Sequence, residues 1–150
     1  MSWTLKRAEK KDFTRINELF VEMLQTIYQT EQVNGYPEGA LDRFFDGRDE
    51  WISIAVDQDK IVAFLSIEVH HEADEFIYLD DFSVTKAYRG QGIGTAMIRA
   101  AEDYAREIHI PAIYFHVEKS NTAAFRLYQR LGYAIHGDQG SRYLMTKKID

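Results

Sequence analysis

Apolar residues recur every three or four positions in several stretches of the chain, which is the period of an amphipathic helix. Asp12 is placed to cap the first of these stretches, and Gly132 follows the last as a typical helix stop. Small residues mark the third stretch, so this helix is suited to close packing on a sheet. The pattern predicts about four helices, at residues 13–27, 38–45, 93–108 and 121–131.

Between these helices lie extended apolar runs that are typical of strands. The run at 61–69 is almost continuously apolar, which predicts burial on both faces. Three successive runs favour an antiparallel meander, whereas the crossover helix before the run at 112–117 makes that strand parallel to 76–84. A turn at Gly137–Gly140 closes a final hairpin. The predicted strands are 3–7, 51–56, 61–69, 76–84, 112–117, 133–136 and 143–147.

Composition narrows the class of protein. The 150 residues predict one domain, 1–150, with no repeat or linker. No apolar run is long enough for a membrane span, and the first residues lack the apolar core of a signal peptide. The absence of cysteine excludes disulfides, thiolate metal sites and a cysteine nucleophile, and it is compatible with a cytoplasmic location, which we expect. The net charge of −6 argues against a nucleic-acid partner.

A glycine-rich turn joins the predicted strand 76–84 to the helix that follows it. Gly90, Gly92 and Gly94 alternate there, so backbone N–H groups and the positive end of a helix dipole converge on a site suited to phosphate. A Walker-type loop would need a lysine after the last glycine, and Ala96 follows Gly94-Thr95 instead. A dinucleotide fingerprint would need a different glycine spacing.

The turn fits a third pattern, Arg/Gln-x-x-Gly-x-Gly/Ala, in Arg89-Gly90-Gln91-Gly92-Ile93-Gly94. A second motif follows at Asn121-x-x-Ala124-x-x-Leu127-Tyr128-x-x-x-Gly132-Tyr133. With both motifs in register, the sequence resembles the GNAT superfamily of acyl-CoA N-acyltransferases. The resemblance implies an α/β (α+β) fold, with a mixed, mostly antiparallel twisted sheet of six to seven strands flanked by helices. It also implies a splayed parallel pair, 76–84 and 112–117, and acetyl-CoA as cosubstrate without a metal.

The resemblance also assigns roles to residues. Backbone groups of the strand would pair with pantetheine, the glycine turn would bind the pyrophosphate, and Tyr128 would protonate the coenzyme A sulfur. Alternatives remain open: Arg89 as a structural residue of the loop, Asn121 as a helix cap, and Arg130 as a solvated side chain. The residues expected to bind the cofactor are Phe82, Ser83, Val84, Arg89, Gly90, Gln91, Gly92, Ile93, Gly94, Thr95, Asn121, Tyr128 and Arg130.

The acceptor side of the reaction is less well defined by the sequence. Asp80 and Asp81 alternate in direction along their strand, so one is expected to face the acceptor. The Tyr78-Leu79-Asp80-Asp81 stretch is similar to diamine and polyamine acetyltransferases of the superfamily. We therefore expect Asp80 as base or amine anchor, with Asp81 and Tyr36 at the substrate. Aspartate stands where those enzymes commonly have glutamate, which shortens its reach.

Other polar residues are weaker candidates. His70, His71 and Glu72 are residue types that bind metal ions. Adjacent side chains at the end of a strand point apart, however, and no third ligand has a recognisable spacing, so we expect no metal site. A solvated turn is the favoured interpretation, with proton transfer by a histidine as the alternative. The remaining candidates near the acceptor are Glu31, Glu38, His116 and Glu118.

The sequence as a whole predicts an acyltransferase that moves an acetyl group from acetyl-CoA to the primary amine of a small acceptor by direct attack. Two alternatives stay open: acetylation of a protein lysine or N-terminus, and a non-catalytic acyl-CoA-binding module. A homodimer is expected from the family resemblance.

Overall fold

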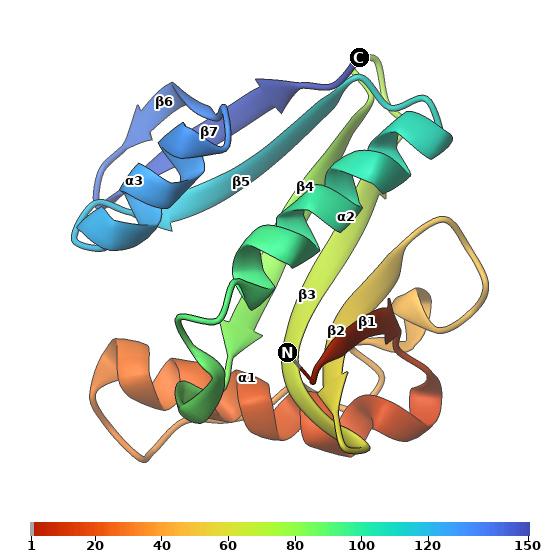
Figure 1. Ribbon diagram of the computed structural model, residues 1–150, viewed down its shortest axis with the longest axis vertical. Coiled ribbons are helices and arrows are strands. Elements are labelled where there is room, and N and C mark those ends of the chain that lie inside the picture. Colours follow the sequence, from red (N-terminus) through yellow and green to blue (C-terminus); the bar gives the residue numbers. More distant parts are fainter. Residues whose placement is uncertain (1) are drawn as a thin grey trace. The chain divides into compact units, whose positions relative to one another are not determined.

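The computed structural model describes residues 2–150, and within that range it contains seven strands and three α-helices (Figure 1). The helices are α1 (Phe13–Tyr28), α2 (Ile93–Glu107) and α3 (Thr122–Arg130). The strands are β1 (Thr4–Arg7), β2 (Trp51–Asp57), β3 (Lys60–His70), β4 (Phe76–Val84), β5 (Ala112–Glu118), β6 (Ala134–Gln139) and β7 (Arg142–Lys148).

The strands form one mixed sheet in the order β1-β2-β3-β4-β5-β7-β6. β4 and β5 run parallel, with Ile77 opposite Ile113 and Tyr78 opposite Tyr114, as the crossover helix predicted. The parallel ladder therefore extends over two residue pairs, whereas β5 pairs antiparallel with β7 along its whole length. β7 lies between β5 and β6, so the last strand in sequence is an interior strand.

The chain divides into two compact units. Unit 1 comprises the residues through Ile67 together with Asp81–Met97, and unit 2 comprises Glu68–Asp80 and Ile98–Asp150. β3, β4 and α2 each contribute residues to both units. The expectation of a single domain stays a prediction.

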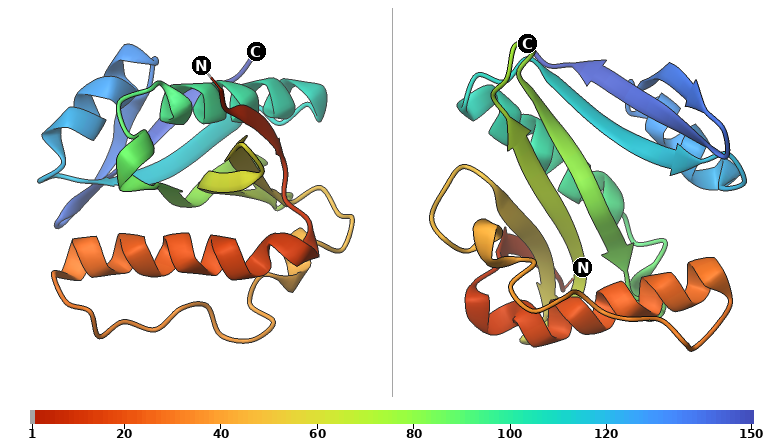
Figure 2. Two further views of the ribbon diagram at one scale, coloured as in Figure 1. Left: turned by 60° about the horizontal axis from the view of Figure 1, so that its bottom comes forward. Right: turned by 180° about the vertical axis from the view of Figure 1, so that it is seen from behind.

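The core of unit 1 forms where α1 lies along one face of β2 and β3 (Figure 2). Ile16 and Leu19 of α1 are completely buried, and they belong to one apolar cluster with Ile52, Ile54 and Phe64 of the strands. Residues 61–67 of β3 are buried without interruption, which agrees with the burial on both faces predicted from their continuous apolar run.

Unit 2 is organised around β5. Ile113, Phe115 and Val117 alternate along the strand and are buried, whereas Tyr114 and His116 between them are half-buried on the opposite face. α3 lies beside β5 and β7 (Figure 1). On the buried side of β5, the ring of Tyr128 from α3 meets Phe115 edge-on at 4.6 Å between centroids.

Three local predictions were wrong. The helix expected at 38–45 is a single 3-10 turn, Asp42–Phe44, because Gly39 has a positive φ of 80° that interrupts a helix. The turn expected at residues 137–140 begins later, because an irregularity between Ile135 and Gly137 lets β6 continue pairing as far as Gln139. Asp12 does not cap α1 through its side chain; its carboxylate accepts the Glu9 N–H at 2.8 Å.

Over residues 2–150, none of the helices has the length and apolar character that crossing a bilayer requires.

Candidate functional site

The glycine turn of unit 1 has the backbone geometry of an anion site. Gly90 and Gly92 have φ values of 78° and 82°, in the left-handed region that favours glycine, and a Cβ added to either would meet nothing within 4 Å. The N–H of Ala96 donates to the Gly92 carbonyl at 3.0 Å and starts the hydrogen-bond ladder of α2. The preceding N–H groups, those of Ile93, Gly94 and Thr95, therefore have no carbonyl partner within the helix.

The side chains of this turn divide between the core and the surface. Ile93 is buried and contributes to a site only through its backbone, whereas Gln91 is exposed and Thr95 half-buried. The turn thus presents main-chain donors at the positive end of a helix, which suits a phosphate or pyrophosphate group.

Arg89 anchors the turn to unit 1. Its Nε donates to the Val84 carbonyl at 3.0 Å, and its guanidinium lies 3.7 Å from the carboxylate of Glu22 on α1. The same carboxylate accepts the hydroxyl of Thr85 at 2.9 Å. These contacts support the structural interpretation of Arg89 that the sequence left open.

The end of β4 packs directly under the turn. Gly94 leaves room for the ring of Phe82, because a Cβ at Gly94 would lie 3.0 Å from the Phe82 Cζ atom. The side chain of Ser83 is buried and that of Val84 is half-buried. Glycine at position 94 therefore permits a close approach of the Phe82 ring, and it has no positive φ.

Tyr36 and Asp81 are brought together in unit 1. The Tyr36 hydroxyl donates to the Asp81 carboxylate at 2.6 Å, its ring stacks on Phe20 at 3.9 Å, and its N–H donates to Asn17 at 2.8 Å. The loop before β2 is thereby fixed to α1 and to β4. Glu31 and Glu38 in the same loop are exposed.

Unit 2 holds the second motif. Asn121 caps α3, since its side-chain oxygen accepts the Ala124 N–H at 3.2 Å. Tyr128 lies in the middle of α3, and its burial raises the pKa of the phenol above the ordinary value, so the hydroxyl stays a hydrogen-bond donor at neutral pH. Arg130 is exposed at the end of the helix.

A hydrogen-bonded chain crosses the open face of the unit 2 strands. The hydroxyl of Tyr78 on β4 is hydrogen-bonded to Nδ1 of His116 on β5, and Nε2 of His116 is hydrogen-bonded to the side-chain oxygen of Gln139 at 2.8 Å. An amide oxygen only accepts, so Nε2 donates to Gln139, and in the tautomer protonated at Nε2 alone Nδ1 accepts from Tyr78. Asp80, two residues after Tyr78, is exposed.

The histidines of the 70–72 turn are engaged with separate carboxylates. His70 lies 3.2 Å from Glu68, and His71 lies 2.8 Å from Glu75. Among residues 2–150 no three histidine, cysteine or carboxylate side chains form a group that could hold a metal ion.

The sequence did not identify Tyr78 or Gln139 as functional candidates. In the sequence, Tyr78 belongs to the stretch that is similar to polyamine acetyltransferases, and Gln139 lies in a predicted turn. The signal that unites them with His116 is strand register, because Tyr78 lies opposite Tyr114 and His116 follows two residues later on the same face.

Comparison with known proteins agrees with the motifs and the fold. The model of the acetyltransferase (GNAT) family matches residues 21–133. The spermine/spermidine N(1)-acetyltransferase of Bacillus subtilis is 33% identical over 76 residues, which are 49% of this chain and 50% of that protein. The chain thus spans about half the length of this relative. N-alpha-acetyltransferase 30 of Schizosaccharomyces pombe is 28% identical over 107 residues, or 64% of this chain and 71% of that one.

Among solved structures, the PaiA N-acetyltransferase of Thermoplasma acidophilum in complex with coenzyme A superposes with a TM-score of 0.79. The match covers 99% of both chains at 17% identity, so it shows a shared fold. The family match spans both motifs and most of the chain. The chain therefore belongs to the acetyltransferase (GNAT) family.

Proposed function

We propose that this protein transfers the acetyl group of acetyl-CoA to the primary amine of a small, cationic acceptor. The observation that carries the proposal is the glycine turn of unit 1, where two positive-φ glycines and the start of α2 present backbone N–H groups around open space. A pyrophosphate is the group in acetyl-CoA that such a turn suits. No metal takes part in the proposal.

The residues of the turn and of β4 fit the cofactor in distinct ways. Gly90 to Thr95 would hold the pyrophosphate through their N–H groups, while the backbone of Phe82 and Val84 would pair with pantetheine as an added strand would. The Phe82 N–H would also stabilise negative charge on the thioester oxygen. Asn121 and Arg130 are the further cofactor contacts proposed from unit 2.

Tyr128 is proposed to act on the leaving group. As the carbon–sulfur bond breaks, charge develops on sulfur and must be stabilised or neutralised by a proton. Burial raises the pKa of the Tyr128 phenol, so its proton is present throughout the pH range in which an enzyme of this kind works. The half-buried position also limits competition from water.

Tyr78 and His116 are proposed to accept the proton that the amine loses. An alkylamine has a pKa of about 10 and attacks only as the neutral form. In the tautomer in which Nε2 donates to Gln139, Nδ1 of His116 accepts from the Tyr78 hydroxyl and can take up its proton. A proton taken by the Tyr78 oxygen is thereby passed to the imidazole. Asp80 is the competing base and is exposed.

The acceptor is proposed to be a small polycation or amino-acid-like amine. Asp80 and the Tyr36-bound Asp81 supply carboxylates, and the Bacillus subtilis relative carries spermine and spermidine in its name. The Schizosaccharomyces pombe relative is named an N-alpha-acetyltransferase, so the α-amino group of a peptide is the second candidate acceptor. A homodimer remains a prediction from the family resemblance, and sedimentation of the purified protein tests it. A cytoplasmic location remains a prediction that is compatible with the absence of cysteine.

Release of free thiol from acetyl-CoA tests the proposal. The purified protein is incubated with acetyl-CoA and, in turn, polyamines, simple diamines, amino acids and peptides with free N-termini. We expect thiol release with small diamines or polyamines and saturable heat of binding for acetyl-CoA alone. Binding without thiol release for any amine would indicate a non-catalytic module, and absence of binding at millimolar acetyl-CoA would refute the proposal.

Matched variants separate the two candidate bases. Tyr78→Phe should lower kcat and change its pH profile, because the first acceptor of the proton is lost. Tyr114→Phe is the control, since Tyr114 lies opposite Tyr78 in the parallel ladder and packs edge-on against Phe76 at 5.3 Å. If Asp80→Asn changes the pH profile and Tyr78→Phe does not, Asp80 is the base.

A further inference from the structure

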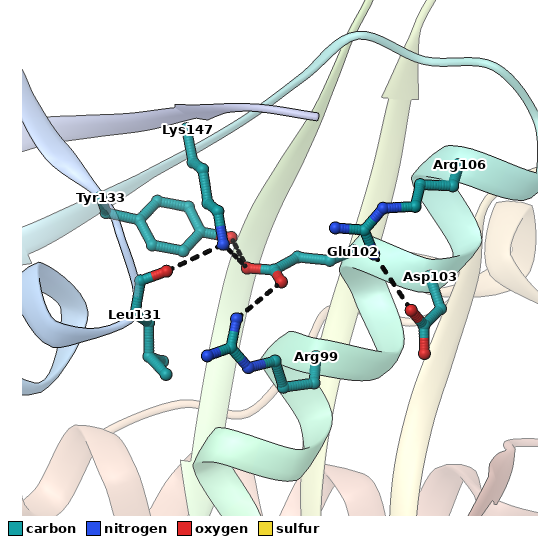
Figure 3. Close-up of polar contacts among 7 residues, drawn as sticks. All are labelled: Arg99, Glu102, Asp103, Arg106, Leu131, Tyr133 and Lys147. Atoms are coloured by element: carbon teal, nitrogen blue, oxygen red, sulfur yellow. Dashed lines mark hydrogen bonds and ion pairs between the residues drawn. The ribbon is translucent and has the colours of Figure 1, made fainter. Parts of the chain in front are cut away.

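A buried carboxylate in unit 2 lies outside the motifs that identify the family. Glu102 on α2 is 1% exposed. Its Oε2 accepts the Tyr133 hydroxyl at 2.9 Å and the Lys147 ammonium at 3.1 Å, and its Oε1 accepts Arg99 at 3.1 Å (Figure 3). Burying a carboxylate is costly unless its oxygens are paired, and here both oxygens have partners.

Two of the partners of Glu102, Lys147 and Tyr133, come from outside α2. Lys147 belongs to β7, and its ammonium also donates to the Leu131 carbonyl at 2.8 Å (Figure 3). That carbonyl follows the last turn of α3, where carbonyls lack partners within the helix. Gly132 next to it has a φ of 98°, and a Cβ there would lie 3.2 Å from the Lys147 side chain. The absence of a side chain at Gly132 therefore leaves room for the Lys147 side chain.

Tyr133 connects this cluster to Tyr128. The carbonyl of Tyr128 accepts the N–H groups of Tyr133 at 3.0 Å and of Leu131 at 3.1 Å. The Tyr133 ring lies 4.8 Å from the ring of Phe115, which in turn meets the Tyr128 ring edge-on at 4.6 Å. The Tyr128 backbone is therefore hydrogen-bonded directly to Tyr133, which Glu102 contacts, and the Tyr128 ring is linked to Tyr133 through Phe115.

Burial and the Glu102 carboxylate raise the pKa of the Tyr133 phenol well above its usual range, so this hydroxyl remains a donor to Glu102. Ion networks of this kind are weak evidence for stability, because apolar replacements are often as stable. What the network fixes is geometry: one rotamer of Tyr133 and one position for the end of α3.

We propose that Glu102 is a positioning residue for Tyr128, acting through Tyr133 and Lys147, an inference that rests on the role proposed above for Tyr128 in acetyl transfer. Loss of the Glu102 charge frees the Lys147 ammonium and the Tyr133 hydroxyl, and the end of α3 then loses its fixed position. The Tyr128 phenol is displaced with it, whereas the glycine turn in unit 1 keeps its own hydrogen bonds.

Glu102→Gln tests the proposal because it keeps the shape of the side chain and removes its charge. Asp103→Asn is the matched control: Asp103 is the next residue of α2 and forms an exposed pair with Arg106 at 3.1 Å (Figure 3). We expect Glu102→Gln to lower kcat by about 10- to 100-fold with KM for acetyl-CoA changed less than about twofold. Asp103→Asn should leave both constants near those of the original protein.

A double variant distinguishes positioning from a general structural effect. In a Tyr128→Phe background the phenol is already absent, so adding Glu102→Gln should change kcat by less than about twofold. If kcat of the double variant is instead reduced by the product of the two single-variant reductions, the proposal is overturned. Tyr133→Phe, which removes a single hydroxyl, repeats the test if Glu102→Gln does not fold.

A readout independent of turnover separates this inference from the proposed function. With 3-fluorotyrosine placed at position 128, the fluorine resonance should shift or broaden in Glu102→Gln and remain unchanged in Asp103→Asn. An unchanged resonance in Glu102→Gln overturns the positioning role even where the protein is active. A shifted resonance in a protein without acetyl transfer activity supports the coupling and rejects the proposed function.

Discussion

Replacement of Gly92 by alanine probes the backbone of the glycine turn. Gly92 has a φ of 82°, and a non-glycine residue in the left-handed region costs about 1–2 kcal/mol. The added methyl group meets nothing within 4 Å in the protein, so strain rather than collision sets the loss of stability. Alanine also lowers the conformational entropy of the unfolded chain, which offsets about 0.4–1 kcal/mol of this loss of stability.

The effect on cofactor affinity should be larger than the effect on stability. The same methyl group enters the open space in which we propose the pyrophosphate lies. Loss of one backbone hydrogen bond to a charged group costs about 1.5–3 kcal/mol, and each 1.4 kcal/mol is about tenfold in Kd. Calorimetric titration with coenzyme A should therefore show Kd raised by about 10- to 100-fold in Gly92→Ala.

Gly47→Ala is the matched control for this prediction. Gly47 has a φ of 85°, lies in unit 1 and also has nothing within 4 Å of an added Cβ, so its strain equals that at Gly92. Both variants should lose similar unfolding free energy in urea titrations, but only Gly92→Ala should lose affinity for coenzyme A. Unchanged affinity in Gly92→Ala, or equal losses of affinity in both variants, would refute the assignment of the turn to the pyrophosphate.

Three further predictions test other residues. Tyr128→Phe should reduce kcat by about 100-fold or more while the calorimetric Kd for coenzyme A stays nearly constant, and equal losses in both would make the hydroxyl structural. Tyr36→Phe removes the 2.6 Å hydrogen bond to Asp81 and should lower the free energy of unfolding by about 1–3 kcal/mol in urea, without effect on coenzyme A affinity. The raised pKa of Tyr133 means that the folded state binds this proton more tightly than the unfolded chain, so its contribution to stability is complete below about pH 10 and is lost as the pH rises further. Denaturation at pH 9 and 11 should therefore show a smaller loss of unfolding free energy in Tyr133→Phe than in the original protein, because Tyr128 keeps its own raised pKa in both.

The features predicted correctly from sequence are those that local residue types determine. The alternating glycines predict the turn, because glycine adopts a positive φ without steric strain, as Gly90 and Gly92 do here. The apolar period gave α1 and α2 to within a residue or two, and the crossover helix fixed the parallel direction of β5. The helix expected at 38–45 failed because apolar spacing there reflects packing of a loop, in which Phe44 is buried by α1 and β2.

Features that depend on register or burial were beyond local reasoning. Tyr78 and His116 are 38 positions apart, and their contact requires the pairing of Tyr78 with Tyr114, which no local pattern specifies. Glu102 is a charged residue in a helix, and its type predicts exposure. Its burial follows from Lys147 and Tyr133, which reach it from 45 and 31 positions away.

The interior position of β7 in the sheet has a consequence for folding during synthesis. Domains generally fold as units as they emerge from the ribosome, amino-terminal parts first. All residues of unit 1 have been made once Met97 is added, whereas β5 and β6 of unit 2 lack the strand that joins them until Arg142–Lys148 is made. Until then Glu102 also lacks Lys147. In a nascent chain stalled before residue 142, unit 1 should therefore resist proteolysis, whereas unit 2 should be cleaved.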